Sequence, residues 1–207
     1  MLDPGSRLEY LRASRAENCR RCALHRNRNK IVFGDGNPDA DIVLVGEAPD
    51  REENTEGIPF IGQAGKVLDG LLRRVGMMRA LDGSIYLCNT VKCWPGHGNP
   101  EPLREQILAC QPFIRMQLRI VRPKVIVTLG RVAGASLTGH KLDTPVGYLR
   151  DHPWQYEDPV TGLSVPLVAT YHPSYILRNI KDDPKIAKEA ALKVQADLEK
   201  ASRIAFP

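Results

Sequence analysis

The chain has 207 residues, 43% of them hydrophobic, and carries a formal net charge of +5 with an isoelectric point near 9.0. This length suffices for one domain with a sizeable core, and we expect a single domain over residues 1–207. Its apolar runs are far shorter than the roughly 18 residues of a membrane span, and Met1–Gly5 does not resemble a signal peptide. We therefore expect a cytoplasmic protein without membrane contact, whose mild basicity is compatible with nucleic-acid binding but does not establish it.

Hydrophobic patterning predicts alternating helices and strands. The run Asp41–Gly46 is apolar without interruption, as is typical of a strand buried on both faces of a parallel sheet. Leu103, Ile107, Cys110, Ile114, Leu118 and Val121 recur at helical spacing. The N-terminal part, about residues 6–30, is predicted to contribute a helix over 6–18 and a cysteine loop over 19–29. In chain order we then predict a strand over 41–46, a helix over 63–75, a strand over 84–89, a helix over 103–121, strands over 124–129 and 166–171, and a helix over 184–201.

This alternation favours a three-layer α/β/α sandwich around a mainly parallel, four-stranded sheet. Ligands of such sheets bind beyond the carboxyl ends of the strands. Unusual residues stand at all four predicted ends: Glu47, Asn89, Gly130 and His172. The sequence therefore predicts that these residues form one site.

The five cysteines point to a metal centre rather than to disulfides, which are rare in the cytoplasm. Cys19 and Cys22 form a CxxC pair, Cys93 follows a strand, and Cys110 lies on the inward stripe of a helix. Cys110 alone would be interpreted as a small core residue, but the four together predict metal or cluster binding. Four thiolates suit zinc and iron–sulfur clusters equally, so the spacing leaves both open. Cys88, in mid-strand, is predicted to be a packed core thiol.

Three further segments carry a family resemblance. They are Gly46-Glu47-Ala48-Pro49 with Gly57–Gly65, Asn89-Thr90-Val91-Lys92-Cys93 with Trp94-Pro95, and His172–Arg178. In their order and spacing, and with the cysteines, they resemble the family 4 uracil-DNA glycosylases over about residues 19–199. The resemblance implies a uracil-DNA glycosylase-like fold and a [4Fe–4S] cluster on Cys19, Cys22, Cys93 and Cys110. It also implies a monomeric, monofunctional base-excision-repair enzyme that hydrolyses uracil from DNA, leaving an abasic site, and that associates with the nucleoid when acting.

The resemblance also implies roles for individual residues. The Asn89 amide offers a donor and an acceptor, which suit uracil O4 and N3–H and reject cytosine. Phe60 is expected to stack on the extruded base. Glu47 would lie beside the sugar–base bond, and His172 would donate to uracil O2 as negative charge collects there. The turn Gly46–Pro49 would bring the backbone of Gly46 and Ala48 close to the bound nucleotide.

The contacts with DNA are expected around the last motif and the cysteine loop. Ser174 and Arg178 are candidates for phosphate contacts, and residues 175–178 are predicted to form a loop that wedges into the space left by the base. The cluster is expected to be structural, holding the basic loop 19–29 at the sheet edge. With a net charge of about −2, it would reduce the charge of the protein from +5 to about +3.

Several alternatives stay open. The general base could be Glu47, which is favoured because it stands at a strand end, or Glu53, or cleavage could be so dissociative that water needs little activation. Asp50 stands where the family commonly has glycine, and its role is not predicted. Two other functions are alternatives: a non-turnover or covalent uracil-DNA-binding protein using His97, and an iron–sulfur electron carrier. The second would leave Asn89 and His172 unexplained.

Overall fold

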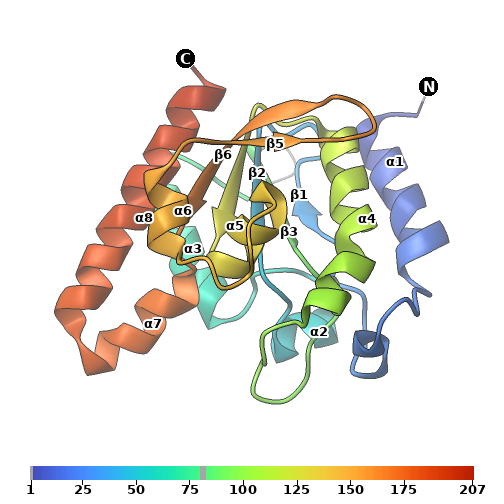
Figure 1. Cartoon of the computed structure of the whole chain (residues 1–207), viewed down its shortest axis with the longest axis horizontal. Coiled ribbons are helices and arrows are strands. Elements are labelled where there is room, and N and C mark those ends of the chain that lie inside the picture. Colours follow the sequence, from blue (N-terminus) through green and yellow to red (C-terminus); the bar gives the residue numbers. More distant parts are fainter. Residues whose placement is uncertain (1, 80–82) are drawn as a thin grey trace.

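The structure, a computed structural model, describes residues 2–79 and 83–207, and its centre is one sheet (Figure 1). The strands are β1 (Asp35–Gly36), β2 (Ile42–Gly46), β3 (Ile85–Asn89), β4 (Val125–Leu129), β5 (Trp154–Glu157) and β6 (Ser164–Thr170). They follow the order β1-β3-β2-β4-β6-β5. The four inner strands are parallel, and the two edge strands pair antiparallel with their neighbours.

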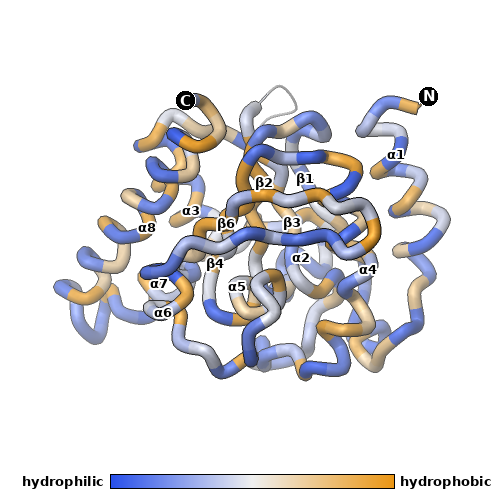
Figure 2. The backbone as a smooth tube through the Cα atoms, turned by 45° about the horizontal axis from the view of Figure 1, so that its top comes forward, coloured by the Kyte–Doolittle hydropathy of each residue, from blue (hydrophilic) through white to orange (hydrophobic). Residues whose placement is uncertain are grey.

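Helices cover both faces of the sheet. They are α1 (Pro4–Leu11), α2 (Arg51–Glu56), α3 (Gln63–Arg74), α4 (Arg104–Val121), α5 (Arg131–Thr138), α6 (Val146–Asp151), α7 (Pro173–Asp182) and α8 (Pro184–Ala205), with a π-helical turn over Arg12–Ala16 and a 3-10 turn over Ala23–Arg26. Alternate side chains of β2 enter two cores: Val43 and Val45 pack with α1, α4 and α5, whereas Ile42 and Leu44 pack with α3, α7 and α8. Figure 2 shows the hydrophobic strands between helices of mixed polarity.

The predicted α/β/α sandwich with a mainly parallel sheet is confirmed, and within the described residues this sheet has six strands rather than four because an antiparallel strand is added at each edge. The four predicted strands match the parallel strands to within two residues at each end. The edge strands escaped prediction for a physical reason. β1 has two residues, and β5 buries only Tyr156 of its four, so neither carries an apolar run.

Two other predictions need correction. The predicted helix 6–18 begins earlier, at Pro4, where Asp3 caps it by accepting from the backbone N–H of Ser6 at 3.0 Å, and it becomes π-helical after Leu11. Residues 175–178 form no loop. They lie within α7, which His172 caps and which Pro173 begins at a position where proline favours a helix start.

Strand register brings the carboxyl ends of the parallel strands to one edge, at the bottom of Figure 1. Gly46 pairs with Asn89, and Leu129 pairs with Thr170. The residues that follow these strands therefore start from a common edge. Among the described residues, no helix is both long and apolar enough to cross a membrane.

Candidate active site

A cavity of about 720 Å³ opens at the carboxyl edge of the sheet. Its walls include all four strand-end residues singled out from the sequence: Glu47, Asn89, Gly130 and His172. The structure thus brings them together as predicted. Ala48, Phe60, Ser174 and Arg178 also line the cavity, as do Asp50 and Glu53.

Gly46 lies behind this wall rather than in it. A Cβ atom at this position would collide with Oδ1 of Asn89 and with the ring of Phe60. A glycine is therefore required at the end of β2 so that the amide and the ring can approach its backbone. Gly46 shapes the cavity from behind.

The side-chain amide of Asn89 is buried, with 1% of the residue exposed, yet neither its nitrogen nor its oxygen has a hydrogen-bond partner within the described residues. An unpaired buried polar group costs about 1–3 kcal/mol, so such groups call for an explanation. Here both groups belong to one amide on the wall of a cavity. The arrangement suits a ligand that offers an acceptor and a donor side by side.

Phe60 is held in an unusual backbone conformation, with φ +56°. Arg79 fixes it by donating to the carbonyl oxygen of Phe60 at 2.7 Å and to that of Pro59 at 3.0 Å. The ring is 3% exposed, and its centroid lies 6.1 Å from that of the His172 imidazole. It forms a rigid apolar wall of the cavity.

His172 is a neutral imidazole whose proton position follows from its contacts. Its Nδ1 accepts from the backbone N–H of Ser174 at 3.1 Å and lies 2.8 Å from the Ser174 hydroxyl, which in turn accepts from Arg178 at 3.0 Å. Burial, and to a lesser extent Arg178, lowers the pKa of His172 to about 4. Because Nδ1 is an acceptor in a neutral ring, these hydrogen bonds assign the proton to Nε2.

Glu47 is half-buried on the cavity wall among charges of both signs. Burial, with a contribution from Glu101, raises its pKa, and the positive charges of Arg131 and Arg178 oppose that rise. Glu101 and Arg131 form an ion pair with each other. A carboxylate with a raised pKa beside a cavity has the character expected of a catalytic base.

Glu53 and Asp50 form a capping box at the start of α2. Oδ1 of Asp50 accepts from the N–H of Glu53 at 2.9 Å, and Oε2 of Glu53 accepts from the N–H of Asp50 at 3.2 Å. Burial, and then the charge of Asp50, raises the pKa of Glu53 to about 8. A carboxyl group that is mostly protonated at neutral pH is a poor base, so the geometry favours Glu47 for that role. It also gives Asp50 a structural role that the sequence did not reveal.

The four predicted ligand cysteines line a second, small pocket together with Lys92. Arg28 donates to Sγ of Cys93 at 3.4 Å and to the carbonyl oxygen of Cys19 at 3.0 Å. Within the described residues, no three His, Cys, Asp or Glu side chains are grouped as a single metal ion requires. Cys88 is fully buried in β3 and does not line this pocket, which confirms its prediction as a core thiol.

Sequence reasoning missed several cavity residues, among them Glu101, Arg131 and Tyr171. Arg131 directly follows the strand-end Gly130, so its position was an available signal. Glu101 lies in a loop and gave none. His97 is exposed beside Trp94, with ring centroids 5.2 Å apart, and it does not line the cavity.

Comparisons with known proteins agree with this geometry. The model of the uracil DNA glycosylase superfamily matches residues 33–196. A type-4 uracil-DNA glycosylase of Thermotoga maritima is 40% identical over 81% of this chain and 82% of its own. Type-4 enzymes of Pyrobaculum aerophilum and Archaeoglobus fulgidus are 35% and 37% identical, over 78% and 77% of this chain and 81% and 78% of theirs. The chain therefore belongs to the uracil DNA glycosylase superfamily and, within it, to the type-4 uracil-DNA glycosylases.

Proposed function

We propose that this protein hydrolyses the N-glycosidic bond of uracil in DNA, releasing free uracil and leaving an abasic site for base-excision repair. The observation that carries the proposal is the buried, unpartnered amide of Asn89 in a cavity whose other walls are Phe60 and His172. Uracil presents O4 and N3–H side by side, which this amide can satisfy. Cytosine presents an amino group and a bare nitrogen there, and would leave both groups unpaired.

In this mechanism the nucleotide is extruded from the stack and the base enters the cavity against Phe60. The Nε2–H of His172 donates to uracil O2, where negative charge accumulates as the bond breaks. Glu47 acts on the sugar side, as the base for water or as the counter-charge of an oxocarbenium-like sugar. Ser174 is engaged by His172 and Arg178, so its first task is to orient the imidazole, and Arg178 is the more available phosphate contact.

Cys19, Cys22, Cys93 and Cys110 would hold a [4Fe–4S] cluster. The observation that supports it is that the four thiols, which come from distant segments, line one pocket. Four thiolates are the ligand set that such a cluster takes. When bound, the cluster would cross-link the loop 19–29 to α4 and to the segment that follows β3.

Incubation with an oligonucleotide containing one uracil, followed by alkali, tests the activity. We expect strand cleavage only after alkali, only at uracil, and not with a matched cytosine substrate. Asn89→Ala should lower the single-turnover rate at least 100-fold, since it removes both hydrogen bonds that read the base. An intact strand would refute the proposal, and an SDS-stable adduct that disappears in His97→Ala would indicate covalent trapping instead.

The role of Glu47 has a separate test. Glu47→Gln keeps the size of the side chain and removes its charge, so turnover should fall strongly while DNA affinity is preserved. Near-normal single-turnover cleavage by this variant would contradict the role and favour a cleavage step that needs no base.

A further inference from the structure

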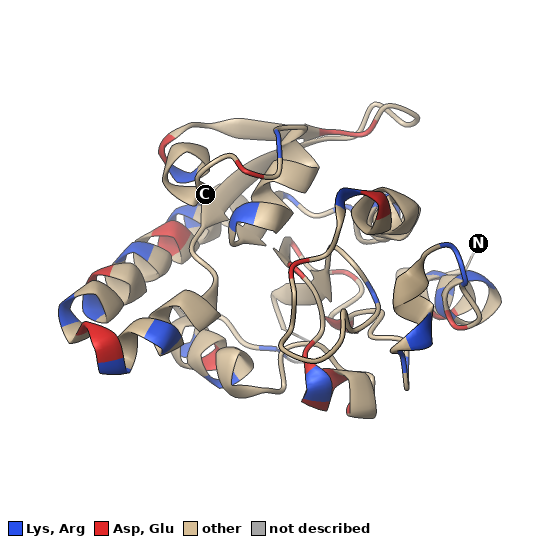
Figure 3. Cartoon of the chain, turned by 60° about the horizontal axis from the view of Figure 1, so that its bottom comes forward, with Lys and Arg blue, Asp and Glu red and all other residues tan. Residues whose placement is uncertain are grey.

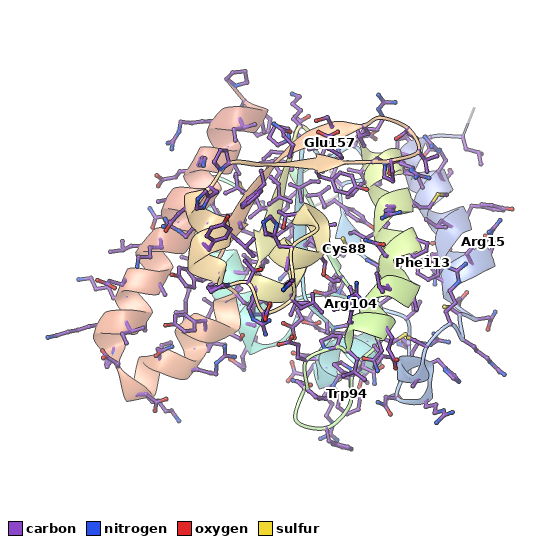
Figure 4. The ribbon with its side chains drawn as sticks, viewed as in Figure 1. Arg15, Cys88, Trp94, Arg104, Phe113 and Glu157 are labelled. Atoms are coloured by element: carbon purple, nitrogen blue, oxygen red, sulfur yellow. The ribbon has the colours of Figure 1, made fainter. Side chains whose placement is uncertain are left out.

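Lys92 is a fully buried lysine between the two pockets. None of its surface is exposed, and it is the first among the largest fully buried side chains of the described residues. Its Nζ donates to the backbone carbonyl of Asn89 at 2.7 Å and lies 5.9 Å from the ring centroid of Phe33. Burial raises the pKa of Cys88, which Figure 4 labels near the centre of the molecule, and the charge of Lys92 opposes that rise.

This buried ammonium has no ion pair with a carboxylate within residues 2–79 and 83–207. An isolated charge in an apolar interior is strongly unfavourable, and burial normally requires a partner of opposite sign. Lys92 lines the pocket of the four ligand cysteines. A cluster with four thiolates and a net charge of about −2 would supply the missing anion.

The second contact of Lys92 leads to the uracil-reading residue. The Asn89 amide makes no hydrogen bond within the described structure, so no hydrogen bond from another side chain fixes its orientation. The position of its backbone therefore matters, and Lys92 holds the carbonyl of that same residue. Lys92 thus contacts both the pocket of the cysteines and the backbone of the base-reading residue.

We propose that Lys92 is the buried counter-cation of the cluster and a positioning residue that couples the cluster to Asn89. The charge of the cluster keeps the ammonium in place, and the ammonium fixes the Asn89 backbone so that its amide faces uracil. The inference rests on the proposed cluster. If the purified wild-type protein contained no iron, the proposed cluster would be refuted before any variant is made.

Lys92→Met, which removes the charge but keeps the length, tests both halves of the inference. The matched control is Arg28→Met, because Arg28 contacts Cys93 but makes no hydrogen bond to Asn89. In iron-loaded Lys92→Met we expect the affinity for free uracil to fall about tenfold, while affinity for abasic DNA stays within about twofold. We expect Arg28→Met to bind uracil like the wild type.

The midpoint reduction potential gives a readout that a purely structural role would not move. Removing a buried cation should lower the potential of the cluster in Lys92→Met, since the reduced cluster is more negative. The inference would be overturned if iron-loaded Lys92→Met bound uracil as tightly as the wild type does, or if the reduction potential of its cluster were unchanged. This holds even if the wild type excises uracil. If Lys92→Met does not fold, Lys92→Arg becomes the deciding variant. Iron loading by Lys92→Arg would support the need for a positive charge at this position, and failure of Lys92→Arg to fold would overturn that need.

Discussion

At the scale of single residues, the cavity depends on which atoms carry protons. His172 is useful as a donor only if Nε2 is protonated, and its neighbours arrange this by donating to Nδ1. The neutral ring also spares the site a buried cation, which would otherwise lie near the positive charge of Arg178. In the proposed mechanism the imidazole is therefore a fixed hydrogen-bond donor and not an acid.

We expect His172 to titrate near pH 4 in histidine NMR spectra, well below the ordinary value near 6.5. Above pH 6.5 the ring is neutral in both the folded and unfolded states. As the pH falls from 6.5 toward 4 the unfolded chain binds a proton that the folded chain does not, so the folded state loses stability. His172→Gln should remove this loss, and Arg178→Met should raise the pKa of His172. A His172 titration at pH 6.5 would contradict the assignment.

At the scale of elements, short pieces of backbone are fixed by single side chains. α2 has only six residues, yet a capping box begins it and Gly57 ends it with φ +80°. Glu53 of this helix and Phe60 both line the cavity, so the helix start lies beside the apolar wall. Helix and cavity are therefore stabilised together.

Glu53→Gln should change how stability depends on pH. The pKa of Glu53 is raised to about 8, so between pH 4.5 and 8 the folded state keeps a proton that the unfolded state releases. The wild type should therefore lose stability relative to Glu53→Gln as pH rises through this range, by roughly 2–4 kcal/mol. Denaturant unfolding at pH 5 and 8.5 measures the difference. Glu52→Gln, an exposed neighbour, should show no such trend, and a flat difference for Glu53→Gln would exclude the raised pKa.

The hairpin of β5 and β6 is braced to α4 by Arg119, which donates to both carboxylate oxygens of Asp158 at 2.9 Å. The Asp158 side chain is fully buried, whereas that of Arg119 is 22% exposed. Arg119→Met would leave a buried carboxylate without its cation and should lower the free energy of unfolding by about 2–3 kcal/mol. Arg104→Met, at an exposed position of the same helix, is the control (Figure 4). Equal stabilities of the two variants would mean that the pair contributes little.

At the scale of the whole molecule, electrostatics is mixed rather than uniformly basic. Figure 3, which turns the cavity edge forward, shows Lys and Arg interspersed with Asp and Glu on α7, α8 and the N-terminal helix. A net charge of +5 spread in this way gives only weak general attraction to DNA. We therefore expect local groups of arginines to supply much of the binding to the DNA backbone.

The exposed arginines of the cysteine loop are the candidates for that role. Arg20→Gln combined with Arg26→Gln should weaken binding to abasic DNA and lower the slope of affinity against salt concentration by about one for each phosphate that is no longer bound. Affinity for free uracil should not change. Lys185→Gln with Lys188→Gln on α8 makes the same change in net charge. Equal effects from both pairs would mean that only the overall charge matters.

The sequence was most informative where local pattern and local chemistry coincide. The apolar run of β2 predicted a buried strand, and the apolar stripe of α4 predicted a helix. The glycine before Glu47 marked the end of β2, at the edge of the sheet where the other parallel strands also end. It was least informative where contacts join distant positions. Nothing local to Arg119 indicated Asp158, 39 residues away, and the short β5 has no apolar run that would have predicted it.

The sequence by itself determined the layered fold through its hydrophobic periodicity, and its motifs carried the resemblance to the family, because both are properties of the chain alone. Only the tertiary structure decided which groups are left unpaired, which proton His172 carries, and that Lys92 stands between the cysteines and Asn89. Burial and hydrogen-bond partners arise from packing between segments far apart in the chain. Protonation states and hydrogen-bond partners can therefore be assigned only from the folded structure.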